Sequence, residues 1–100
     1  MGQVTFKTQE ELDQEKLTSW RESTKVSRLQ AKAALAEFGH LDAAQAIIDD
    51  PATSTLAKLA WVEASEFRRA SPMMLQIAQL LELTDEQLDE LFEYASTVEV

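Results

Sequence analysis

The stretch "LELTDEQLDELFEYA", residues 81–95, contains the clearest helix start in the chain. Thr84 and Gln87 have the spacing of a capping box, in which each side chain accepts a hydrogen bond from the other residue's backbone N–H. Asp85 and Glu86 follow in the first turn, where carboxylates favour the positive end of the helix dipole. Apolar residues then recur at helical spacing, which predicts one buried side: Leu88, Leu91, Phe92 and Ala95.

Similar signals divide the preceding residues into short helices. Ser27 and Gln30 form a second capping-box pattern, and Gly39 suits a left-handed helix end because it has no Cβ. Ser71 followed by Pro72 is typical of a helix N-terminus, where the missing proline N–H costs nothing. The expected helices cover about 28–38, 41–49, 55–69, 72–81 and the residues from 85 onward.

Composition agrees with a helical protein. The chain has 100 residues, 45% of them hydrophobic, with only two glycines and two prolines. We therefore predict an all-α fold, a small orthogonal or bundle-like array of about five short helices over residues 25–100. Residues 1–24 are polar and form an N-terminal arm, with a β-prone stretch at Gln3–Lys7 and a possible local helix at about Gln9–Leu17. We expect the arm to be ordered only if something packs on it.

The net charge of −9 is concentrated at the C-terminal end. Residues 70–100 carry seven acidic side chains and no lysine or arginine. The last two helices resemble a helix-turn-helix DNA reader in outline, but a helix that enters a DNA groove needs basic or neutral polar side chains. We expect acidic side chains on the exposed face of the last helix, which argues against nucleic acid and anionic membranes as partners: Asp85, Glu86, Asp89, Glu90 and Glu93.

The sequence contains few residues that are arranged for catalysis or metal binding. Cysteine is absent. His40 is the single histidine, and the sequence shows no serine or cysteine nucleophile that it could activate as a general base. Asp85, Asp89 and Glu93 share one helix face, but a straight helix supplies too few oxygens for calcium, so a solvated acidic face is expected. We therefore predict no enzyme activity, no cofactor and no metal. Neither a signal peptide nor a membrane span is evident.

Three apolar residues of the arm are the predicted partner-binding residues: Phe6, Leu17 and Trp20. Aromatic residues are enriched at binding hot spots, and Trp20 has few apolar neighbours in the sequence. The alternative is that the arm folds back and Trp20 covers the helical core.

The third expected helix carries the basic residues of the central region. Leu56, Leu59 and Phe67 have a spacing that predicts a common apolar stripe, with Trp61 close to it. Arg68 and Arg69 could hold an acidic partner. We favour ion pairs with Glu63, Glu66 or the acidic last helix.

Two sequence motifs indicate a resemblance to a known family. "AW..A.EFRR.SP" at 60–72 and "LTDEQLDELF" at 83–92 resemble a small helical module of tailed bacteriophages and prophages, found in small tail-region proteins and tail-fibre assembly factors. The resemblance covers about residues 25–99. In that pattern a glycine usually precedes the Leu-Thr pair, whereas this chain has Glu82.

The resemblance implies a non-enzymatic phage protein, located in the virion or the host cytoplasm. Its partner would be a phage structural protein of the tail, baseplate or fibre, and homo-oligomers are plausible because virion components usually repeat. The alternative is an acidic regulator or inhibitor of a DNA-binding protein, with a helix-turn-helix-like outline.

Overall fold

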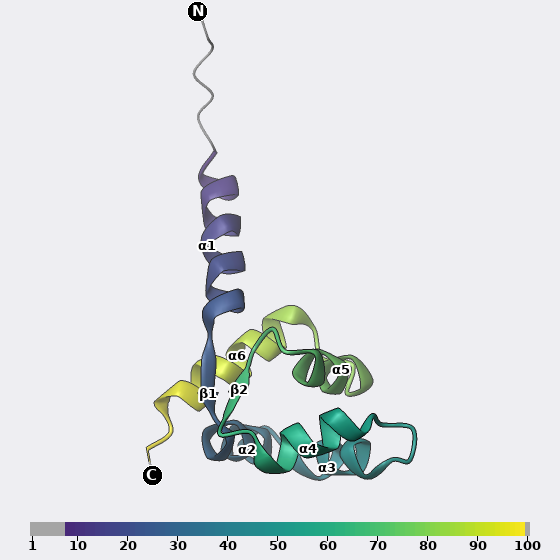
Figure 1. Cartoon of the computed structure of the whole chain (residues 1–100). Coiled ribbons are helices and arrows are strands. Elements are labelled where there is room, and N and C mark those ends of the chain that lie inside the picture. Colours follow the sequence, from purple (N-terminus) through teal and green to yellow (C-terminus); the bar gives the residue numbers. More distant parts are fainter. Residues whose placement is uncertain (1–7, 100) are drawn as a thin grey trace, which may run out of the picture.

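A computed structural model describes residues 8–99 of the chain (Figure 1). The fold is mostly helical, with one very short antiparallel sheet, and so the predicted all-α class is confirmed. In chain order the elements are α1 (Gln9–Ser23), β1 (Lys25–Ser27), α2 (Arg28–Glu37), α3 (Leu41–Asp49), α4 (Thr55–Glu63), β2 (Glu66–Arg68), α5 (Pro72–Leu80) and α6 (Asp85–Thr97).

Local capping determines where most of these helices begin. The Ser27 hydroxyl accepts from the Gln30 N–H at 3.0 Å, and the Gln30 side chain accepts from the Ser27 N–H at 2.9 Å. The same two bonds join Thr84 and Gln87, at 3.1 and 2.8 Å. Ser71 caps α5, which begins at Pro72. Both predicted capping boxes and the proline start of α5 are therefore confirmed.

The predicted third helix is too long. α4 ends at Glu63, and Glu66–Arg68 forms strand β2 instead of further helical turns. The cause is tertiary pairing: β2 lies antiparallel to β1, with Phe67 opposite Val26. The Phe67 side chain is buried, with its ring centroid 5.6 Å from that of Trp61, so extending the chain here places a large aromatic side chain in the core.

The core lies between α2 and α6, with α3, α4, α5 and the small sheet around them. The predicted stripe of α4 is wrong, because Leu56 and Leu59 are exposed while Ala57 and Trp61 are buried. The Trp61 indole N–H donates to the Gln45 side chain at 2.9 Å, which satisfies the one polar atom of this buried ring. The largest fully buried side chains are Trp61, Phe67, Phe92, Leu35, Met74, Ile77, Leu88 and Leu91.

Helix α1 extends well past the predicted Gln9–Leu17 segment, to Ser23. Figure 1 shows it projecting from the body of the protein, with β1 continuing from its C-terminal end into the sheet. The arm is therefore joined to the body through Thr24 and β1.

The turn between α5 and α6 keeps the backbone geometry for which glycine is suited. Glu82 has a φ of 58°, in the left-handed region. The Leu83 N–H donates to the Ala78 carbonyl at 2.9 Å and the Glu82 N–H to the Gln79 carbonyl at 3.1 Å, which closes the end of α5. A side chain in this conformation is strained by roughly 1 kcal/mol.

Replacing Glu82 by glycine should therefore stabilise the protein. We expect Glu82→Gly to raise the free energy of unfolding by about 0.5 kcal/mol and the Tm by a few degrees, because relief of strain exceeds the added entropy of the unfolded chain. Chemical and thermal denaturation followed by circular dichroism measure the change. In the control Gln76→Gly, an exposed residue inside α5, stability should fall by about 1 kcal/mol. Destabilisation by both substitutions would show that the turn is not strained.

Candidate functional site

The C-terminal end of α1 is tied to the body of the protein. Trp20 is half-buried and packs against the hydrophobic core. The Trp20 carbonyl accepts two hydrogen bonds from Thr24, one from its backbone N–H at 2.9 Å and one from its hydroxyl at 2.6 Å. The Arg69 N–H donates to the Thr24 carbonyl at 3.0 Å, which continues the β1–β2 ladder to the end of α1. The last turn of α1 is thus held by both packing and backbone bonds.

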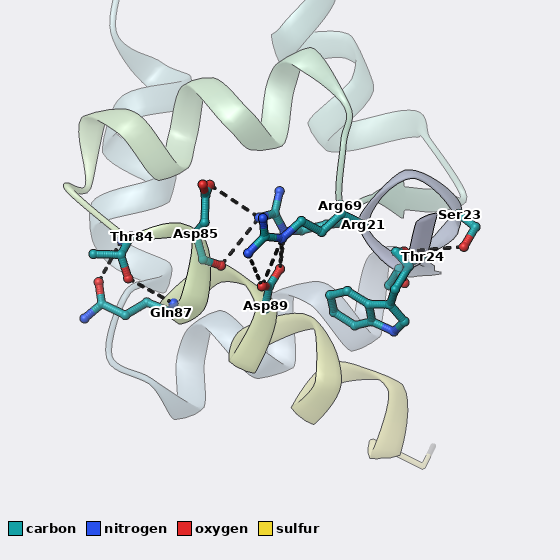
Figure 2. Close-up of polar contacts among 9 residues, drawn as sticks. Arg21, Ser23, Thr24, Arg69, Thr84, Asp85, Gln87 and Asp89 are labelled. Carbon is teal, nitrogen blue, oxygen red and sulfur yellow. Dashed lines mark hydrogen bonds and ion pairs between the residues drawn. The ribbon is translucent and has the colours of Figure 1, made fainter. Parts of the chain in front are cut away.

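The strongest polar contacts at this junction converge on one carboxylate, that of Asp89 on α6 (Figure 2). Arg21 on α1 donates from Nε at 3.1 and 3.0 Å to the two carboxylate oxygens, and from Nη2 at 2.7 Å. Arg69, which directly follows β2, donates from Nε at 3.0 Å to one of them. We call Arg21, Arg69 and Asp89 the anchor cluster, since it joins α1, the end of β2 and α6.

The anchor cluster is largely removed from solvent. Its side chains are exposed by 19% for Arg21, 4% for Arg69 and 11% for Asp89. The Arg69 guanidinium also reaches Asp85, whose carboxylate lies 3.5 Å and whose backbone carbonyl 3.4 Å from Nη2. Two arginines thus enclose the buried carboxylate of Asp89, and the Asp85 carboxylate, 70% exposed, adds a second negative charge at the border of the cluster.

Hydrogen bonding to Asp89, aided by the nearby negative charges, raises the pKa of Arg21 above its already high ordinary value. A raised pKa means that the charged form is favoured in the folded protein. Its contribution to stability is therefore complete below the ordinary pKa of arginine and is lost only as the pH rises above that value. Arg21 therefore keeps its positive charge, and with it its hydrogen bonds to Asp89, throughout the neutral and moderately alkaline pH range.

The sequence prediction for these residues was correct in one part and wrong in another. Arg69 does pair with the acidic last helix, as favoured. Arg68 is exposed and makes no ion pair with any residue from 8 to 99. Asp89 was expected on a solvated acidic face but is buried, because two arginines from distant parts of the chain enclose it. The role of Arg21 was missed, since no local pattern relates it to a residue 68 positions away.

Beyond the anchor cluster, α1 is exposed to solvent. Leu17 is half-buried, while the residues from 8 to 16 are all exposed, including Leu12 at 39%. Leu12 and Trp20 border a shallow surface hollow on one side of α1, together with Lys16 and Ser19. Of the predicted partner-binding residues, Leu17 and Trp20 therefore both lie on α1, with Trp20 at its anchored end. Phe6 lies outside the described residues.

The other chemical candidates of the sequence are not assembled into a site. His40 precedes α3 and makes no side-chain cap bond. Within residues 8–99, no three histidine, cysteine, aspartate or glutamate side chains are grouped so as to hold a metal ion. No helix in this part of the chain is both long and apolar enough to cross a membrane. What the geometry offers is a helix held at one end and open to contact along the rest of its length.

Loss of the central carboxylate should weaken the whole body. In Asp89→Asn the Arg69 guanidinium stays buried without its main anion, and we expect the free energy of unfolding to fall by roughly 3 kcal/mol. Urea unfolding monitored by tryptophan fluorescence measures this change. Glu90→Gln, at the next and exposed position of α6, should change stability by less than about 0.5 kcal/mol. Equal effects of the two substitutions would mean that the buried ion pairs are not structural.

Loss of Arg21 should instead loosen α1. A 15-residue helix is marginally stable alone, so its last turns depend on the anchor cluster. For Arg21→Gln we expect amide hydrogen exchange in α1 to become roughly tenfold faster, corresponding to the loss of charged hydrogen bonds of about 1.5 kcal/mol. Lys16→Gln on the same helix is the control and should leave exchange unchanged. Unaltered exchange in Arg21→Gln would show that α1 is held without the ion pair.

Comparisons of the chain with protein-family models, with curated proteins and with solved structures find no significant match. A role for α1 and the anchor cluster therefore has to come from the residues themselves.

Proposed function

We propose that this protein is a non-enzymatic structural or assembly protein of a phage tail, acting through protein–protein contacts made by α1. The observation that carries the proposal is the exposed helix α1, fixed at its C-terminal end by the anchor cluster. The resemblance of residues 25–99 to the phage module supports the tail association. The partner would be a tail, baseplate or fibre protein, met in the virion or in the host cytoplasm.

A helix held in this way suits recognition by a partner. Ordering a free segment costs conformational free energy at the moment of binding, whereas α1 is already helical and oriented. Its exposed side offers Leu12 and the part of Trp20 left open by the core. Exposed apolar side chains on a helix can dock in a hydrophobic groove of a partner.

The charge of α1 adds a requirement on the partner. Acidic side chains surround Leu12, and those at Glu10, Glu11 and Asp13 are exposed. We therefore propose that the partner surface is an apolar groove bordered by lysine or arginine. Long-range attraction between such a basic border and a chain of net charge −9 would also speed association.

A second candidate is favoured by the exposed face of α6. Glu86, Glu90 and Glu93 are solvent-exposed there, and α5 and α6 are consecutive helices joined by a short turn. Such an acidic surface could occupy the basic face of a DNA-binding protein, which makes the chain an inhibitor and not a DNA reader. In this candidate α6, and not α1, is the contact surface.

Mass spectrometry of purified phage particles tests the tail proposal. We expect either a fixed copy number per virion or, for an assembly helper, co-purification with a tail, baseplate or fibre protein from lysates of infected cells. Co-purification with a DNA-binding protein and absence of every tail protein would support the inhibitor and contradict our proposal.

A matched pair of variants tests the contact surface. Leu12→Asp places a charge on the side of α1 that carries Leu12 and Trp20, and we expect it to weaken binding of the captured tail partner by about tenfold or more. Thr18→Asp adds the same charge at an exposed position of α1 that does not border the hollow, and should bind like the natural protein. Circular dichroism confirms that both variants keep their helices. Equal binding by all three proteins would exclude this side of α1 as the contact surface.

A further inference from the structure

An apolar groove lies beside strand β2, on the side of the body formed by α4 and α5. Its volume is about 340 Å³, and its lining includes Leu56, Ala60, Phe67, Pro72 and Met73. A groove of this size falls in the range of roughly 300–1,000 Å³ typical of binding pockets. Leu56 is 77% exposed at its border and adds apolar surface to the rim of the groove.

Strand β2 has an open edge next to this groove. In the β1–β2 ladder, Arg28 donates to the Ser65 carbonyl and Arg69 to the Thr24 carbonyl, both at 3.0 Å. Because an antiparallel ladder alternates, Glu66 and Arg68 direct their backbone groups away from β1.

The Arg68 carbonyl accepts from the Ser71 N–H at 3.1 Å. The N–H groups of Glu66 and Arg68 and the Glu66 carbonyl have no backbone partner among residues 8–99. No residue that lines the groove belongs to β1, which covers the opposite edge of β2. The groove thus combines apolar walls with free strand-pairing groups, the two features that bind an extended peptide by strand addition.

The chain itself contains a segment that fits these features. In the stretch Gln3–Lys7, "QVTFK", an extended backbone places Val4 and Phe6 on one face and Thr5 on the other. Two apolar side chains at this spacing can enter the groove while the backbone pairs with Glu66 and Arg68.

The segment cannot reach the groove of its own molecule. Thr8 caps the outer end of α1, and the two residues from Thr8 to Phe6 can span at most about 7 Å even when fully extended. The 15 residues of α1 separate Thr8 from the C-terminal end of the helix by roughly 22 Å, and Figure 1 shows α1 projecting from the body. A covalently attached segment therefore falls short, and the groove of a second copy is the available one.

We propose that residues 3–7 of one copy add to the open edge of β2 in a second copy, with Val4 and Phe6 in the apolar groove. The contact joins two different surfaces of the same chain, so repetition gives a ring or a filament instead of a closed two-fold dimer. This inference is independent of the proposed tail function, because it concerns the purified protein alone.

Sedimentation and light scattering of the purified full-length chain, as a function of concentration, provide the first test. We expect reversible self-association that Phe6→Ala weakens by about tenfold or more, as is typical for truncation of a central aromatic side chain. Thr5→Ala changes the opposite face of the segment and should have a much smaller effect. A wild-type chain that stays monomeric up to millimolar concentration, or equal effects of the two variants, would overturn the proposal.

Variants of the groove complete this test. Leu56→Gln alters its border and should weaken association, whereas Val62→Gln, on α4 but not in the groove, should not, although Val62 is also exposed, at 61%. Both positions are exposed, so loss of folding does not confuse the comparison.

Mixing two complementary variants tests the head-to-tail arrangement. A chain lacking residues 1–7 keeps the groove but has no segment to donate, while Glu66→Pro keeps the segment but loses the outward N–H of β2 without touching the β1 ladder. We expect each variant alone to be monomeric and an equimolar mixture to form a one-to-one pair that grows no further. Monomers that do not pair on mixing would contradict strand addition, and so would a variant that still self-associates alone.

Discussion

The carboxylate of Asp89 is the contact on which the arrangement of α1, β2 and α6 depends. Its two oxygens accept from Arg21 and Arg69, which are 48 positions apart in the sequence, and all three side chains are largely excluded from water. A buried charge without a partner of opposite sign costs free energy. Orientations of α1 that would separate Arg21 from Asp89 are therefore disfavoured. The cluster therefore specifies one orientation of a helix that otherwise makes few contacts with the body.

The small β1–β2 sheet brings these charges to the same place. Thr24 lies opposite Arg69 in the continued ladder, and Arg21 is less than one helical turn before Thr24. The pairing thus sets both arginines at one end of the sheet, beside α6. It also explains why α4 stops early, because Phe67 must be in an extended segment to lie opposite Val26 and contact Trp61. Three residues in each strand suffice, since Phe67 at the centre of the ladder is buried against Trp61 of α4.

Features that depend on neighbouring residues were predictable from the sequence, and features that depend on distant ones were not. The capping boxes at Ser27 and Thr84 involve residues three apart, and both formed. The sheet and the anchor cluster join residues up to 68 positions apart, and helix periodicity carries no information about such pairs. For that reason Asp89 was assigned to the wrong environment, although its position on α6 was right. The number of acidic residues in the sequence predicted an acidic last helix. It carries no information on the two arginines that neutralise the inner side of α6.

A fixed α1 has a consequence for assembly that a flexible arm would not have. A flexible linker allows its end to return to its own molecule, where the effective concentration is highest, and self-binding then competes with assembly. A rigid helix of about 22 Å excludes that return and so directs the terminal segment to another copy. In the proposed head-to-tail contact, the angle between neighbouring copies is set by the direction of α1, and hence by the hydrogen bonds from Arg21 to Asp89. Closure into a ring needs a constant angle at each contact, and a buried bidentate ion pair at the base of the helix is well suited to keep it constant.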